Sequence, residues 1–234
     1  QFGYAAAFGT GTVLSAARRR HLGELAGRYG FVVVDDDPYR DLGSVAPPPR
    51  LREFVPDRLA VSVGSFSKTV APGLRVGWVH APAELTAAMV TMKQADDLHT
   101  STLAQRLLLE LLDTPGWLER RIAATVHANR PRARALVDGL TSRLGPRVEV
   151  DPVDGGMLVW ATFPGCPIDT DALFPIALEQ GVAIVPGSAF DHRGRPSRSA
   201  RLCFATLDVD QPDVAAGRLA AAVDVAWKDP VGSR

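Results

Sequence analysis

The sequence predicts an α/β fold, in which a domain with a mostly parallel sheet is followed by a smaller C-terminal α+β domain. Two apolar runs, 31-FVVVD-35 and 59-LAVSVG-64, show little polar alternation, which is typical of strands buried on both faces of a parallel sheet. A helical pattern precedes the first run and a loop separates the two, as in a sheet covered by helices. Beyond about residue 125, long helical patterns alternate with short strands, which indicates a second domain.

The elements of the first half follow from capping residues and periodicity. Ser15 can accept a hydrogen bond from a helical amide, and Gly30 can adopt the left-handed conformation that ends a helix. Pro82 suits the start of a later helix, where its missing amide hydrogen is not needed. In chain order, we expect a helix at 16–30, a strand at 31–35, a proline-rich loop at 46–50, strands at 59–64 and 75–80, and a helix from Pro82 through the Met92 region.

The second half combines longer helices with short strands, the composition of an α+β domain. We therefore predict two domains, residues 1–125 and residues 126–234. In this half, we expect helices at about 101–113, 116–144, 169–180 and 211–227, and strands at 147–150, 156–162, 182–185 and 200–206.

Composition and charge exclude several classes of function. The formal net charge is zero and no long run of one sign occurs, so we expect this chain itself to bind neither nucleic acid nor an anionic membrane. No apolar run is long enough to span a bilayer and the start lacks a signal-peptide pattern, which predicts a cytoplasmic protein. The two cysteines and five histidines have no metal-ligand spacing, so no metal site is expected.

One lysine has unusual surroundings. Only three of the 26 basic residues are lysines, and Lys68 lies among small, hydroxyl-bearing and apolar residues in 61-VSVGSFSKTVAPGLRVGW-78. An arginine stays protonated, whereas a lysine in a desolvated site can lose its proton and attack a carbonyl. The choice of lysine at this position therefore indicates amine chemistry.

Two polar groups follow neighbouring predicted strands, at the edge where parallel sheets bind ligands. Taken alone, the acids of 35-DDDPYR-40 could also be a solvated turn, a helix start or a metal site. Together with the lysine segment they match the needs of pyridoxal phosphate, which are an amine for its aldehyde, an acid for its ring nitrogen and donors for its phosphate. The predicted site comprises Lys68 as the amine, Asp36 at the ring nitrogen, Tyr39 at the ring hydroxyl, and Ser65, Ser67 and Arg75 at the phosphate.

These motifs resemble those of a known enzyme family. The segment GSFSKTVAPGLRVGW with DDDPY upstream is similar to the class I/II, fold-type I aminotransferases, which use pyridoxal 5'-phosphate. The resemblance extends to the 2-aminoadipate/kynurenine aminotransferase branch and to the aminotransferase-like domain of GntR/MocR-type regulators. Further matching segments are 94-QADDLHTSTLAQ-105, 155-GGMLVW-160, 184-IVPGSAF-190 and 201-RLCFAT-206.

The resemblance implies a role for each matching residue. Lys68 would hold the cofactor as a Schiff base and move the substrate proton, with Asp36 and Tyr39 as the other catalytic residues. Arg201 would bind the carboxylate shared by the α-amino acid and the 2-oxo acid. The family also implies a homodimer, in which the segment around Thr100 and Ser101 would reach the partner subunit's site.

The resemblance also implies that the N-terminal part of the cofactor domain is missing. The family carries a glycine-containing phosphate loop and an aromatic residue stacked on the cofactor ring before the position of Gln1. An asparagine of its N-P-T-G motif would fall near 8-FGTG-11, where no asparagine stands. Residues 1–125 would then be a partial cofactor-binding domain and residues 126–234 the small domain.

Two other functions fit parts of the sequence. The string from Ser65 to Lys68 matches S-x-x-K, the nucleophile motif of penicillin-binding proteins and class A β-lactamases, which should open a helix. The chain lacks the Ser-Asp-Asn and Lys-Thr-Gly partners of that motif. The other alternative is a cofactor-sensing domain of a transcriptional regulator, which a winged helix upstream of Gln1 would indicate.

Overall fold

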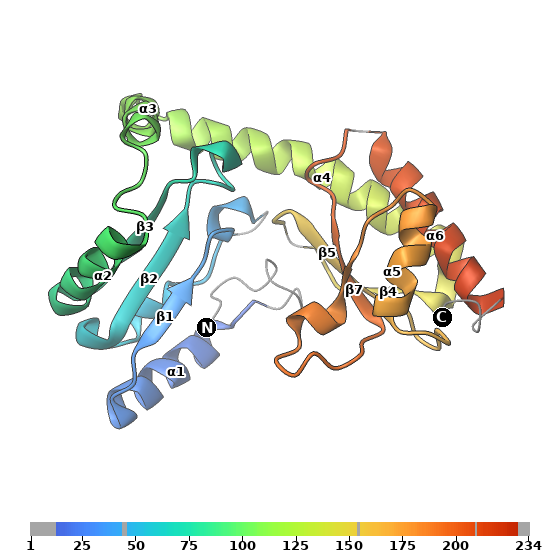
Figure 1. Cartoon of the computed structure of the whole chain (residues 1–234), viewed down its shortest axis with the longest axis horizontal. Coiled ribbons are helices and arrows are strands. Elements are labelled where there is room, and N and C mark those ends of the chain that lie inside the picture. Colours follow the sequence, from blue (N-terminus) through green and yellow to red (C-terminus); the bar gives the residue numbers. More distant parts are fainter. Residues whose placement is uncertain (1–12, 44–45, 154, 209, 229–234) are drawn as a thin grey trace. The chain divides into compact units, whose positions relative to one another are not determined.

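The structure is a computed structural model that describes residues 13–43, 46–153, 155–208 and 210–228. These residues form two compact units, one extending to Val126 and the other beginning at His127 (Figure 1). Among the described residues, no helix is long and apolar enough to cross a membrane.

The first unit contains a three-stranded sheet in the order β1-β2-β3. Strands β1 (Val33–Asp36) and β2 (Ala60–Ser65) are parallel, whereas β3 (Gly77–His80) is antiparallel to β2. The prediction of a mostly parallel sheet is therefore wrong for the described part, where the sheet is mixed. A parallel return needs a long crossover, usually a helix, and the connection between β2 and β3 contains only a short 3-10 turn.

Helix α1 (Ala16–Tyr29) covers one face of this sheet (Figure 1). Ser15 caps it by accepting a hydrogen bond from the Arg18 amide, and Gly30 ends it with φ of 72°. The helix approaches its neighbours closely at Gly23, where an added Cβ would lie 2.1 Å from the carbonyl oxygen of Phe54. The buried side chains in this layer are Ala26, Val33, Leu51, Val55, Leu59 and Ala60.

The opposite face of β1 is open among the described residues. Val33 is buried, but Val32 and Val34 are 45% and 42% exposed, so the strand alternates. The prediction that 31-FVVVD-35 is buried on both faces is therefore wrong, because α1 and the turns that follow β1 cover only one of them.

The remaining helices of the first unit lie between β3 and the second unit in the chain. They are α2 (Ala83–Asp96), α3 (Thr102–Asp113) and the first part of α4 (Trp117–Leu144). Ser101 caps α3 by accepting a hydrogen bond from the Ala104 amide. Four 3-10 turns (Arg40–Leu42, Leu51–Glu53, Asp57–Leu59 and Pro72–Leu74) complete the connections.

The second unit combines a four-stranded antiparallel sheet with helices, and its expected elements are present. The strand order is β4-β5-β7-β6. Alternation in β7 places Ala200 and Leu202 in the core and leaves Arg201 half-buried on the other face. The elements are the rest of α4, β4 (Glu149–Val150), β5 (Leu158–Thr162), α5 (Thr170–Glu179), β6 (Val185–Pro186), β7 (Ser199–Cys203) and α6 (Gln211–Lys228).

Candidate active site

Asp36 and Ser65 end neighbouring strands and share one face of the sheet. The register pairs Asp36 with Val63, and Ser65 lies two residues beyond Val63 on the same side. Asp36 is half-buried, and its burial raises the pKa of its carboxyl above the ordinary value. A cation at this carboxyl would favour its ionised form.

Lys68 lies in the turn that follows β2. The turn is closed by backbone hydrogen bonds from Val70 and Ala71 to the carbonyl oxygen of Phe66. The half-buried Lys68 places its Nζ 5.5 Å from the centroid of the buried Tyr39 ring, within cation–π range. The structure thus brings together two of the predicted residues, which come from different strand ends.

Ser65, Ser67 and Arg75 form a second group beside this turn. The Ser67 amide donates to Ser65 Oγ at 3.1 Å, and Arg75 Nη1 donates to Ser67 Oγ at 3.2 Å. Arg75 has φ of 54°, in the left-handed region that is strained for a side chain with a Cβ. These two hydroxyls and the guanidinium are donors suited to an anion with several oxygens, and the left-handed backbone of Arg75 helps to bring them together.

Four charged residues that were not assigned a role in the predicted site lie beneath it. Asp35 and Asp37 point to the α1 side of the sheet, and Arg19 and Arg40 are buried with them. Asp37 lies 3.6 Å from Arg40 as an ion pair, and Asp35 Oδ2 accepts from the Leu51 amide. The alternation of β1 was the signal that could have separated these acids from Asp36, because every second residue faces the same side.

Arg201 lies in the second unit, apart in the chain from the other six predicted residues. Its guanidinium carbon stands 4.8 Å from the centroid of the Phe190 ring. Phe190 in turn meets Trp160 edge to face, with 5.5 Å between ring centroids. Trp160 is half-buried and pairs with Arg201 across β5 and β7. The Phe190 ring covers one face of the Arg201 guanidinium, whose N–H groups donate in the plane of that group.

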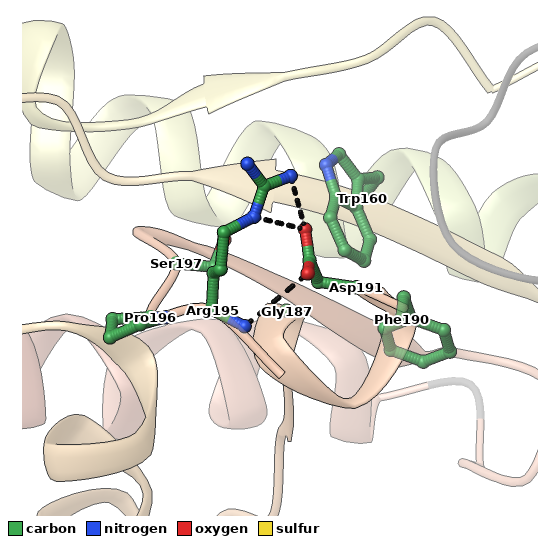
Figure 2. Close-up of a pocket in the computed structure, with 7 residues that line it drawn as sticks. All are labelled: Trp160, Gly187, Phe190, Asp191, Arg195, Pro196 and Ser197. Atoms are coloured by element: carbon green, nitrogen blue, oxygen red, sulfur yellow. Dashed lines mark hydrogen bonds and ion pairs between the residues drawn. The ribbon is translucent and has the colours of Figure 1, made fainter. Parts of the chain in front are cut away.

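A pocket of about 410 Å³ adjoins this aromatic pair (Figure 2). Figure 2 shows the Arg195 guanidinium directed at the Asp191 carboxylate, with Trp160 beside them. Arg195 donates to Asp191 Oδ2 through Nε at 3.0 Å and Nη2 at 2.7 Å, and the Arg193 amide donates to Oδ1. These bonds hold the pKa of Asp191 well below its usual range. The loop after β6 is thus held by its own internal hydrogen bonds where it lines the pocket.

The geometry bears on two of the alternatives. Residues 66–70 after Ser65 form turns, whereas the S-x-x-K motif of β-lactamases requires a helix there. In the described part of the chain, no group of three or more histidine, cysteine or acidic side chains is arranged to hold a metal ion. Asp36 faces one side of the sheet, whereas Asp35 and Asp37 are buried on the other.

Known proteins are similar to this chain in sequence. Residues 9–219 match the family described as aminotransferase class I and II. The 2-aminoadipate transaminase of Thermus thermophilus is 36% identical over 203 residues, which cover 85% of this chain and 50% of that protein. The uncharacterized HTH-type transcriptional regulator YisV of Bacillus subtilis is 30% identical over 200 residues, covering 85% of this chain and 41% of that protein.

A solved structure shares the fold. It is the crystal structure of LysN, an alpha-aminoadipate aminotransferase from Thermus thermophilus, complexed with N-(5'-phosphopyridoxyl)-L-leucine. The similarity has a TM-score of 0.87 at 34% sequence identity and covers 94% of this chain and 57% of that chain. The chain spans about half the length of the curated relatives it matches.

Proposed function

We propose, from the premise that the chain belongs to the class I and II aminotransferase family, that it carries the cofactor lysine of a pyridoxal-phosphate-dependent aminotransferase. Such an enzyme transfers an amino group between an α-amino acid and a 2-oxo acid. The observation that carries the proposal is the contact between the Lys68 amine and the Tyr39 ring. Lys68 lies in the turn just beyond β2, the strand that ends at Ser65.

The described side chains fit that cofactor. The hydroxyls of Ser65 and Ser67 and the guanidinium of Arg75 form a donor set suited to a phosphate. Burial raises the pKa of the Asp36 carboxyl, and a protonated ring nitrogen beside it would favour the ionised form of that carboxyl. When bound, pyridoxal phosphate supplies a reactive carbonyl and an electron-withdrawing ring.

The residues divide the proposed work among them. The Lys68 amine would hold the cofactor covalently and, once displaced by the substrate, would take the proton from the substrate Cα and deliver it to the former aldehyde carbon of the cofactor. Asp36 would keep a proton on the ring nitrogen, and Tyr39 would donate to the ring oxygen. Arg201 would orient the substrate by binding its carboxylate with two parallel hydrogen bonds.

A homodimer is part of the same proposal. Helix α3 begins just after the segment that the family uses to reach the partner subunit, and Leu103 and Leu107 on it are 79% and 51% exposed. Met92 and Leu98 nearby in the chain are exposed as well. Apolar side chains of this size gathered on neighbouring elements are typical of a protein interface. We propose that a second copy of the chain covers them, with residues 1–125 forming part of the cofactor domain.

The scarcity of lysine gives a direct test. The protein is incubated with pyridoxal phosphate, reduced with borohydride, and digested, and labelled peptides are identified by mass spectrometry. We expect labelling of Lys68 in preference to Lys93 and Lys228, loss of that label in Lys68→Arg, and its retention in the exposed control Lys93→Arg. Equal labelling of all three lysines would show that Lys68 has no special reactivity and would refute the proposal.

A cofactor-sensing regulator is the second candidate. It is favoured by the 30% identity to YisV, which is described as an HTH-type transcriptional regulator. Both candidates require the Lys68 site, so labelling does not distinguish them. Turnover of amino acid and 2-oxo acid by the protein favours the enzyme, whereas cofactor binding without turnover, together with a winged helix encoded upstream of Gln1, favours the regulator.

A further inference from the structure

The turn that carries Tyr39 is built on buried charge. Asp37 and Arg40 flank it, and Asp35 and Arg19 lie on the same side of the sheet. Each of the four exposes less than a tenth of its surface. Acids and arginines are rarely buried to this extent unless their partners are fixed.

The bonds around the turn tie it to its surroundings on both sides. The Asp37 amide donates to the carbonyl oxygen of Val63 on β2 at 3.2 Å, and Arg40 Nη2 donates to the carbonyl oxygen of Pro48 at 2.6 Å. The Asp37 and Arg40 side chains meet each other as an ion pair at 3.6 Å. Tyr39 lies between these anchors, with its ring against the Lys68 amine.

We propose that Asp37 and Arg40 are positioning residues, whose buried ion pair holds the turn after β1 so that the Tyr39 ring stays against the Lys68 amine. The inference rests on the proposed role of Lys68 as the cofactor lysine. It concerns the geometry of the chain before any cofactor binds, so it can be tested separately.

The energetics of the pair support positioning over simple stabilisation. Burial, reinforced by the charge of Asp35, raises the pKa of Asp37 to about 6, although Arg40, Arg19 and Arg50 oppose the shift. The neighbouring arginines thus do not fully compensate the ionised Asp37 carboxyl for the loss of its interactions with water. Neither oxygen accepts a hydrogen bond from the described residues, so the ion pair with Arg40 is its main fixed contact. A buried carboxyl that ionises in spite of this desolvation, beside a candidate site, points to a role in that site.

The contact itself can be followed by NMR without cofactor. Reductive methylation with ¹³C-formaldehyde labels the three lysines, and Lys68→Arg identifies the Lys68 signal by its loss. The Tyr39 ring should displace this signal upfield of those from Lys93 and Lys228. As the pH falls from 8 to 5, we expect it to return toward them with a midpoint of about 6, as Asp37 is protonated and the pair is broken.

Variants assign the titration. Asp37→Asn should show at pH 8 the Lys68 signal that the unaltered protein shows at pH 5, with no further change between these values. Asp41→Asn, which removes an exposed carboxylate from the same turn, should behave like the unaltered protein. The transition should survive in Asp36→Asn, because Asp36 faces the other side of the sheet.

Three results would overturn the inference. The first is a Lys68 signal in folded Asp37→Asn that matches the unaltered protein at pH 8. The second is the absence of any transition near pH 6 in the unaltered protein, which decides the matter even if Asp37→Asn does not fold. The third is loss of the transition in Asp36→Asn. If the NMR results are as expected but pyridoxal phosphate does not label Lys68, the proposed function fails while the positioning role stands.

Discussion

The buried Asp37 should make the stability of the protein depend on pH in an unusual direction. Its pKa is raised from an ordinary value of 3.8 to about 6, so the folded state binds this proton more tightly than the unfolded chain does. The stabilisation from the protonated carboxyl is fully present below pH 3.8 and is lost as the pH rises through 6. Most buried ion pairs act in the opposite sense, because the acid's pKa is lowered.

The size of the effect follows from the shift. About two pKa units correspond to about 3 kcal/mol between the two protonation states. Asp37→Asn mimics the protonated form and does not titrate. The free energy of unfolding of the unaltered protein, minus that of Asp37→Asn, should therefore fall by most of this amount, about 2.4 kcal/mol, between pH 4 and pH 7.

Urea unfolding followed by circular dichroism at several pH values measures this difference. Comparing the two proteins at each pH cancels the carboxyls they share, including Asp36, whose pKa is also raised. The exposed control Asp41→Asn should give a difference that is nearly independent of pH. A difference for Asp37→Asn that stays flat would mean that Arg40 balances the burial of the carboxyl, and one that rises with pH would mean that Arg40 outweighs it; either result would refute the reasoning.

Three further predictions concern packing, the candidate phosphate group and assembly. Gly23→Ala should destabilise the protein by more than about 2 kcal/mol, because the new methyl group meets a backbone carbonyl. Gly27→Ala in the same helix has room for the methyl group and should be neutral or stabilising. Thermal unfolding compares the two variants. Arg75→Gln should raise the dissociation constant for pyridoxal phosphate about tenfold or more by removing the guanidinium, with an unchanged constant as the contrary result in an absorbance titration. Replacing Leu103 and Leu107 together by glutamate should shift sedimentation toward the monomer if the exposed leucines form the dimer contact; an unchanged sedimentation profile would place the contact elsewhere.

The sequence predicted the local elements of the fold well, because their signals are local. Ser15 and Gly30 mark the ends of α1 by hydrogen bonding and by backbone conformation, and both act in the structure as expected. The direction of β3 was not predictable in this way, since it depends on how the chain returns after β2. The exposure of Val34 was equally hidden, because an unbroken apolar run does not reveal whether one face or both will be covered.

The candidate site shows the same division. Lys68 and Arg75 could be proposed from a single short segment, and in the structure the Arg75 guanidinium donates a hydrogen bond to Ser67 of that segment. The contact between Lys68 and Tyr39 required only the expectation that neighbouring strands end together. The aromatic platform under Arg201 was missed, because Phe190 and Arg201 are brought together by strand pairing that no local pattern records.

The proposed phosphate group has a consequence for how the site assembles. Ser67 and Arg75 are only eight residues apart, and Ser65 lies two residues before Ser67. Closing so short a loop costs little chain entropy, so this part of the site is expected to form early and independently of the second unit. Unfolding of the second unit would then leave Ser65, Ser67 and Arg75 in place. If these donors bind phosphate as proposed, a bound phosphate would stabilise this turn even while the second unit is unfolded.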